Sequence, residues 1–166
     1  MKQPLLLASS SPFRQALLAK LGLPFTSASP EIDESTRPDE TAEQLVVRLA
    51  QQKALALAES APQSLIIGSD QIGCLEGRFL GKPLTEKKAY EQLRAASGQV
   101  VTFYTGLALY CGRRRQFWQC CETYQVTFRH LRDEEIEAYL AREQPLNCAG
   151  RFKSEEIGRA SCGEEC

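Results

Sequence analysis

The sequence has only one histidine, His130, and none of its seven cysteines forms a C-x-x-C pair. Zinc sites need clustered cysteine and histidine ligands, so the sequence does not indicate one. Cys120 and Cys121 would point to opposite faces of a strand, which argues against a shared site. We expect reduced, structural cysteines, as in cytosolic proteins, and no disulfide scaffold.

The sequence also lacks a long apolar run, a signal-peptide pattern and an excess of either charge. No segment approaches the length of a membrane span, so we expect a cytoplasmic protein without a membrane partner. The formal net charge of −1 gives no electrostatic reason to expect nucleic acid as a partner. The 166 residues, 43% of them hydrophobic and 25% charged, suggest one globular domain of ordinary composition.

Apolar periodicity, capping residues and turn signals predict strands and helices that alternate along the chain. The predicted strands are 5–8, 24–29, 64–75, 100–111 and 117–129. The predicted helices are 13–21, a long amphipathic helix that begins after Thr41 and includes Leu55, 86 to about 96, and 133–143. Thr41 and Gln44 form a capping box, and Leu45, Leu49 and Leu55 are expected on the apolar face of the second helix. Interleaved strands and helices without repeats predict an α/β fold with a mixed sheet.

Three serines lie between the first strand and the first helix. Ser11 is a good N-cap and Pro12 fits the first helical position, so the turn of Ser9 to Ser11 opens a helix N-terminus. The unpaired N–H groups there suit an anion such as phosphate, and Arg14 adds a cation in the first turn. The alternative is an ordinary capped turn with a solvated arginine.

A polar Ser-Asp-Gln segment follows the apolar run LIIG of the predicted strand 64–75 and places Asp70 where open α/β sheets bind ligands. Carboxylates at 31, 33 and 34, together with Lys53 and Lys82, could supply oxygen ligands for a divalent metal and cations for phosphate. The alternatives are a chain-turning aspartate and a solvated acidic loop. The Walker A pattern is absent, which excludes a P-loop nucleotide enzyme.

Seven short motifs follow one another within residues 4–155: LLLASSSPFRQALL, EIDE, RLAQQKA, LIIGSDQ, GKPLT, VVTFYTGLAL and CAGRFKSE. In this order and spacing they resemble the Maf family of nucleotide pyrophosphatases, and in particular its YceF-type branch of 7-methyl-GTP pyrophosphatases. The resemblance implies a Maf/ITPase-like α/β fold, in which a mixed twisted sheet with flanking helices forms two lobes around a nucleotide cleft.

The resemblance also implies roles for single residues. Asp70 would be the base that activates water, and Glu34 with Asp70 would hold a divalent cation (Mg²⁺, Mn²⁺ or Co²⁺). Lys53 and Lys82, with Ser9 and Arg14, would bind the phosphates.

Three further positions would set the base specificity, and they are Phe13, Gln71 and Glu155. An aromatic ring at 13 can attract the cationic base of 7-methyl-GTP, and a carboxylate at 155 can accept hydrogen bonds from guanine. The alternative for Phe13 is plain packing in the core. The implied activity is hydrolysis of 7-methyl-GTP to 7-methyl-GMP and pyrophosphate, which removes modified nucleotides. The alternatives are a dTTP/UTP pyrophosphatase and a nucleotide-binding regulator of septum formation without turnover.

Family members continue beyond the FKSE motif through further segments that this chain lacks. We therefore expect a pyrophosphatase domain over residues 1–155 that is incomplete at its C-terminus, followed by a non-native tail at 156–166. The resemblance also suggests a homodimer.

Overall fold

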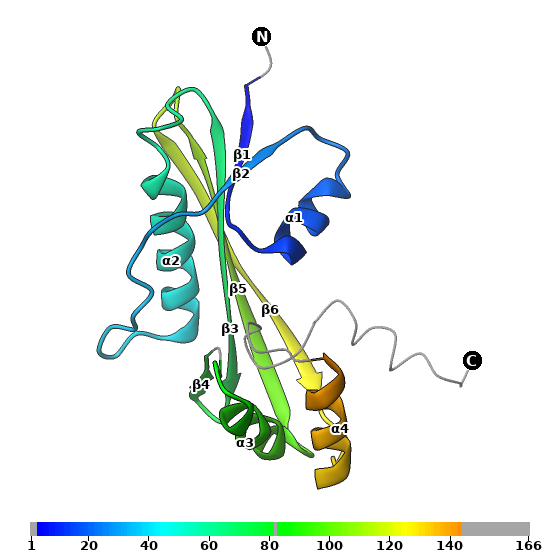
Figure 1. Cartoon of the computed structure of the whole chain (residues 1–166). Helices are drawn as coiled ribbons and strands as arrows, with labels where there is room; N and C mark the ends of the chain where they lie inside the picture. The colour runs from blue at the N-terminus through cyan, green and yellow to red at the C-terminus, as the bar shows by residue number, and fades with distance from the viewer. Residues whose placement is uncertain (1–2, 82, 144–166) are drawn as a thin grey trace, which may run out of the picture. The chain divides into compact units, whose positions relative to one another are not determined.

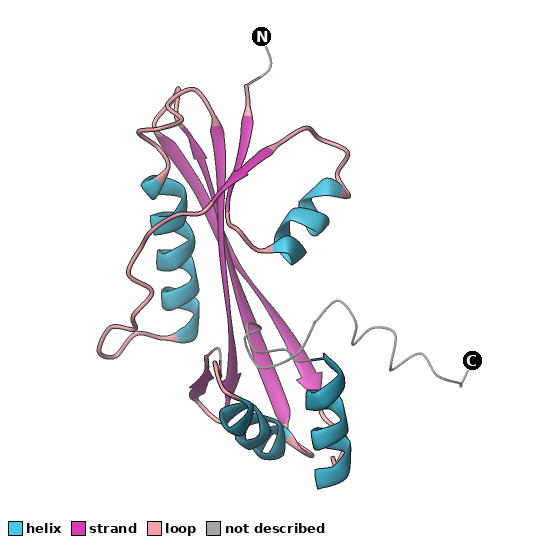
Figure 2. Cartoon of the chain, viewed as in Figure 1, coloured by secondary structure: helices cyan, strands magenta, loops and turns pink. Residues whose placement is uncertain are grey.

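The computed structural model describes residues 3–81 and 83–143, and its helices and strands alternate as predicted (Figures 1 and 2). The elements in chain order are β1 (Leu5–Ala8), α1 (Pro12–Ala19), β2 (Thr26–Ala28), α2 (Ala42–Ala56), β3 (Leu65–Leu75), β4 (Arg78–Leu80), α3 (Glu86–Ala96), β5 (Val100–Cys111), β6 (Gln116–Thr127) and α4 (Asp133–Glu143). Lys82, Glu155 and the predicted tail at 156–166 lie outside the described residues.

The sheet is mixed, which confirms the predicted α/β class. Its strand order is β2-β1-β3-β5-β6, with β4 paired to β3 at one side. β1 runs parallel to both β2 and β3, whereas β4 is antiparallel to β3. β5 and β6 are neighbours joined by only four residues, and such a short connection requires antiparallel strands.

The chain divides into two compact units. Unit 1 comprises the described residues up to Gln71 together with Tyr104–Thr123, and unit 2 comprises Ile72–Phe103 and the described residues from Tyr124. The nucleotide cleft expected between two lobes stays a prediction, as do the domain boundary at 155 and the tail.

In unit 1, helix α2 packs against the sheet at two glycines. A Cβ at Gly68 of β3 would lie 2.0 Å from the carbonyl oxygen of Ala50, and one at Gly106 of β5 would lie 2.2 Å from that of Val46. Only a residue without a side chain allows this close approach. The two glycines therefore set how near α2 lies to the strands.

The apolar face of α2 differs from the expected one at a single position. Leu45 and Leu49 are buried as predicted, but Leu55 is 48% exposed, so its predicted place in the core is wrong. Six residues separate Leu49 from Leu55, and this spacing turns a side chain about 240° around the helix. The buried stripe instead continues at Lys53, four residues after Leu49, where a charged residue is 6% exposed.

Unit 2 has two hydrophobic clusters. One joins helices α3 and α4 through Ala89, Leu93, Ile136 and Leu140, and the other lies around Val101 and Phe103 of β5. A tight turn at Glu76 and Gly77, both with positive φ, reverses β3 into β4 as the sequence predicted. Within 3–81 and 83–143, every helix is too short or too polar to be a membrane-span candidate.

Candidate active site

Lys53 forms the centre of the site in unit 1. Its Nζ lies 2.6 Å from Oδ1 of Asp70 on β3 and 2.7 Å from Oε1 of Glu34 in the loop before α2. The side chains of Lys53 and Asp70 are 8% and 15% exposed, and that of Glu34 is 49% exposed. A buried ammonium needs paired charges, and here two predicted site carboxylates supply them.

The contact between α2 and β3 explains why Lys53 and Asp70 meet. Gly68 and Asp70 are two residues apart on β3, so both lie on the sheet face that α2 covers. The backbone of Ala54, next to Lys53, lies 2.9 Å from the position of a Cβ on Gly68. This close packing brings the lysine side chain within reach of the carboxylate.

The serine turn leaves the sheet at the same level as Asp70. Leu5–Leu7 of β1 pairs in parallel with Leu65–Ile67 of β3. Ser9 and Asp70 each come two or three residues after these paired segments, at their carboxyl ends. Ser9 is buried and its Oγ accepts a hydrogen bond from the N–H of Ser11 at 3.1 Å. Oγ of Ser11 caps α1 by accepting from the N–H of Arg14 at 3.5 Å. The predicted cap is confirmed, and anion binding by Ser9 and Arg14 stays a prediction.

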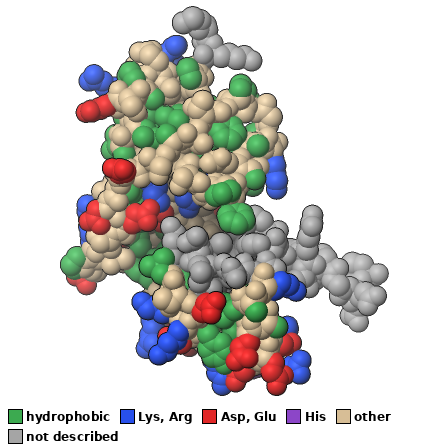
Figure 3. Space-filling view, viewed as in Figure 1, with side chains coloured by type: hydrophobic (Ala, Val, Ile, Leu, Met, Phe, Trp, Pro, Cys, Tyr) green, Lys and Arg blue, Asp and Glu red, His purple; other side chains and the backbone are tan. Residues whose placement is uncertain are grey.

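Of the predicted specificity residues, Phe13 and Gln71 lie in unit 1. Phe13 is 42% exposed on α1, a helix without buried residues, so the alternative that it packs in the core is wrong. Figure 3 shows hydrophobic side chains at the surface of the face drawn, and single exposed apolar side chains are common on folded proteins. Gln71 donates from Nε2 to Oγ1 of Thr105 on β5 at 2.9 Å, which fixes the orientation of its amide.

Two residues that contact the site or its loop, Thr105 and Arg48, were not predicted from the sequence. Thr105 interrupts an apolar strand, and its polar side chain was the available signal. Arg48 binds the loop that carries Glu34, and its only signal was its place in the RLAQQKA motif, five residues before Lys53.

Glu34 and Asp70 fit a divalent cation that is shared with a substrate. Their oxygens converge on one point, since both lie within 2.7 Å of the same nitrogen. In the described part of the chain, no group of three or more histidine, cysteine or acidic side chains could hold a metal. Mg²⁺ is commonly held by one or two carboxylates with substrate phosphates and water, so two carboxylates are a suitable donor set.

Asp33 has a different part in the loop from its neighbour Glu34. Its carboxylate accepts hydrogen bonds from the N–H and the hydroxyl of Ser35, both at 2.9 Å. The bond from the Ser35 N–H, followed by the hydroxyl bond, lowers the pKa of Asp33 below its usual value. Asp33 therefore shapes the turn, and Glu34 points to Lys53.

Two comparisons with known proteins show what the chain is similar to. The sequence pattern of the family described as Maf-like protein matches residues 4–163. A 7-methyl-GTP pyrophosphatase from Pseudomonas aeruginosa is 53% identical over 165 aligned residues, which cover 97% of this chain and 86% of the relative. These matches confirm the family indicated by the seven motifs.

Proposed function

Because the chain belongs to the Maf-like protein family, we propose that it is a nucleotide pyrophosphatase that hydrolyses 7-methyl-GTP to 7-methyl-GMP and pyrophosphate. The observation that carries the proposal is the pair of contacts from Lys53 to Asp70 and Glu34. These three residues are a base, a cation and a second carboxylate in one place, which is the set that hydrolysis of a triphosphate needs. The name of the Pseudomonas aeruginosa relative supports the choice of substrate.

Asp70 is the base in the proposed reaction. Its carboxylate accepts a proton from water while the water oxygen bonds to phosphorus. The bond between the α- and β-phosphoryl groups breaks, and pyrophosphate leaves with the electron pair of that bond. Lys53, already within 2.6 Å of Asp70, donates hydrogen bonds to the phosphate oxygens as they gain charge.

Further residues hold the substrate in this proposal. Glu34 and Asp70 would hold Mg²⁺, Mn²⁺ or Co²⁺, and such a cation neutralises charge on the phosphate oxygens. Ser9, Arg14 and Lys82 bind the phosphates. Phe13, Gln71 and Glu155 contact the base.

The methylated base explains the aromatic residue at position 13. Methylation makes the guanine ring cationic, and an exposed aromatic face attracts a cation. We expect the protein to act on free nucleotide in the cytoplasm, where it removes modified nucleotides, and to form a homodimer.

The test is pyrophosphate release by the purified chain with Mg²⁺ or Mn²⁺, with 7-methyl-GTP, GTP, dTTP and UTP compared side by side. We expect 7-methyl-GTP to be preferred and Asp70→Asn to lose at least about 100-fold in rate, as expected for loss of a general base. Circular dichroism of both proteins shows whether they are folded. Preference for dTTP or UTP would support the canonical-nucleotide alternative. Nucleotide binding without release by the folded protein would support the regulator alternative.

A further inference from the structure

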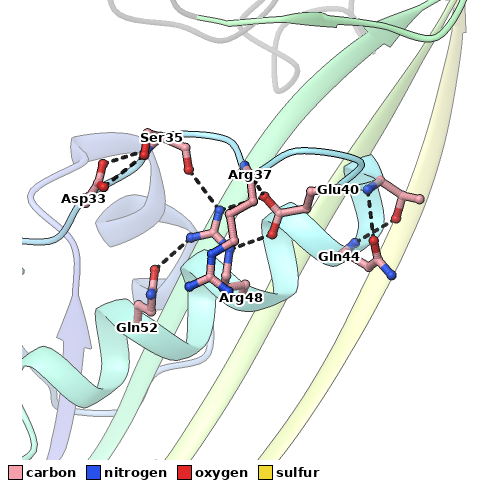
Figure 4. Close-up of polar contacts among 8 residues, drawn as sticks. Asp33, Ser35, Arg37, Glu40, Gln44, Arg48 and Gln52 are labelled. Carbon is pink, nitrogen blue, oxygen red and sulfur yellow. Dashed lines mark hydrogen bonds and ion pairs between the residues drawn. The ribbon is translucent and has the colours of Figure 1, made fainter.

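Arg48 of α2 binds the loop in front of the helix through both edges of its guanidinium (Figure 4). Its Nε lies 2.6 Å from Oε1 of Glu40 and its Nη2 lies 2.7 Å from Oε2 of the same residue. Nη2 also donates to the backbone carbonyl of Ser35 at 2.9 Å, and Nη1 donates to Oε1 of Gln52 at 3.1 Å. Three of these hydrogen bonds join the loop to the helix, and the fourth, to Gln52, lies within α2.

The Arg48–Glu40 pair is shielded from solvent. The two side chains are only 14% and 8% exposed, and paired, bidentate geometry makes such a contact stronger than an ordinary surface ion pair. Oε2 of Glu40 accepts a further bond from the N–H of Arg37 at 3.1 Å. The hydrogen bond from Arg48 is the largest cause that lowers the pKa of Glu40 to about 2. The Arg48–Glu40 pair, which we call the clamp, therefore stays ionised at neutral pH.

The clamp holds the chain next to a predicted metal ligand. Ser35 directly follows Glu34, and residues 29–37 belong to no helix or strand. A segment without a hydrogen-bonded ladder depends on side-chain contacts for its position. The bond from Arg48 to the Ser35 carbonyl fixes the backbone one residue from Glu34, while Gln52 is one residue from Lys53.

We propose that Arg48 is a positioning residue for Glu34, acting through the Glu40 carboxylate and the Ser35 carbonyl. The hydrogen bonds of Arg48 go to Glu40, Ser35 and Gln52. They fix the loop so that Glu34 meets Lys53 and the cation bound with the nucleotide. This inference rests on the proposed function, since the part of Glu34 as a metal ligand belongs to it.

Removing Arg48 should change the Mn²⁺ affinity in opposite directions, depending on whether Arg48 acts through its charge or by positioning the loop. If Arg48 acted only as a positive charge near the site, Arg48→Gln would strengthen Mn²⁺ binding, and Glu40→Gln would weaken it. If Arg48 positions the loop, both variants bind Mn²⁺ more weakly than the wild type. The double variant then has about the same Mn²⁺ affinity as the single variant that binds less tightly. Loss of a residue that orients a metal ligand typically weakens metal binding by roughly 10- to 100-fold.

The experiment measures Mn²⁺ binding by electron paramagnetic resonance on the full chain and on Arg48→Gln, Glu40→Gln and the double variant. Arg48→Lys keeps the charge without the planar fork, and we expect it to bind Mn²⁺ as weakly as Arg48→Gln. Arg113→Gln is the matched control, because Arg113 donates to Gln63 at 3.0 Å elsewhere in unit 1 and should leave Mn²⁺ binding unchanged.

The outcomes separate this inference from the proposed function. Unchanged or tighter Mn²⁺ binding by Arg48→Gln and Arg48→Lys, with a wild type that binds the ion, would overturn the positioning role and leave the function intact. A wild type that neither binds Mn²⁺ nor releases pyrophosphate would overturn the function. In that case amide hydrogen exchange over residues 33–40 decides: faster exchange in the folded Arg48→Lys variant than in Arg113→Gln supports positioning of the loop, and equal exchange refutes it.

Discussion

The Nζ atom of Lys53 lies 2.6 Å from Oδ1 of Asp70, although one residue is on helix α2 and the other on strand β3. The same nitrogen lies 2.7 Å from Glu34. The ammonium therefore occupies the point on which two predicted metal ligands converge. A cation that entered between these carboxylates would compete with Lys53 for the same oxygens, and this competition links the lysine to metal affinity.

Lys53→Met should bind Mn²⁺ more tightly than the wild type while losing pyrophosphate release. Removing one positive charge that faces both carboxylates favours a cation by about 1–4 kcal/mol, which corresponds to roughly 5- to 900-fold in affinity. Calorimetric titration with Mn²⁺ measures the change. Lys53→Arg keeps the charge and is the control, with affinity close to that of the wild type. Weaker Mn²⁺ binding by Lys53→Met would contradict the competition.

Gly68→Ala should destabilise the fold and separate Lys53 from Asp70. The added Cβ would lie 2.0 Å from the backbone carbonyl oxygen of Ala50, so α2 must move away from β3. Overpacking against backbone costs about 3 kcal/mol, and urea unfolding measures this loss. Gly81→Ala is the control, because a Cβ there meets no atom within 4 Å among the described residues beyond its chain neighbours. Equal stability of the two variants would show that α2 does not depend on this glycine.

Much of the fold could be predicted because its signals are local. The capping box of Thr41 and Gln44, the N-cap at Ser11 and the turn at Glu76 and Gly77 each depend on a few adjacent residues, and all are present. Leu45 and Leu49 are four residues apart and share one face of the helix. Leu55 was wrongly added to that face, although it follows Leu49 by six residues. The exposed side of α2 follows from the helix period and not from residue type.

The site could be predicted only in part. The residues Glu34, Lys53 and Asp70 came from family motifs, and the structure brings all three together. The Arg48 clamp could not be found in this way, since its contact with Glu40 depends on the path of an irregular loop. No helical or strand periodicity describes such a path.

Acid should weaken the Arg48–Glu40 clamp between about pH 4.5 and pH 2. The pKa of Glu40 is lowered from 4.5 to about 2 in the folded protein, chiefly by the hydrogen bond from Arg48. A lowered carboxylate pKa stabilises the folded state above the unfolded pKa, and the contribution is lost as the pH falls toward the folded pKa. Urea unfolding should therefore show that the free energy of unfolding falls less between pH 6 and pH 3 in Glu40→Gln than in the wild type.

Glu135 provides the comparison for this pH dependence. Its pKa is also lowered to about 2, with the hydrogen bond from Arg129 as the largest cause, but the pair lies in unit 2 and is more exposed. We expect Glu135→Gln to reduce the acid sensitivity less than Glu40→Gln, because solvent screens the exposed pair. A larger reduction of acid sensitivity in Glu135→Gln than in Glu40→Gln would show that Glu40 is not the main source of the acid sensitivity.

Phe13→Ala should weaken binding of 7-methyl-GTP without weakening the fold. The ring is 42% exposed, so its removal uncovers little buried surface. Cation–π attraction contributes about 0.5–2 kcal/mol, which predicts a roughly 2- to 30-fold rise in KM for 7-methyl-GTP and a smaller rise for GTP, whose base is neutral. Leu17→Ala is the matched control, since Leu17 is 56% exposed on the same helix and should change neither KM. An equal rise in KM for both nucleotides would mean that the ring contacts the base without recognising its charge.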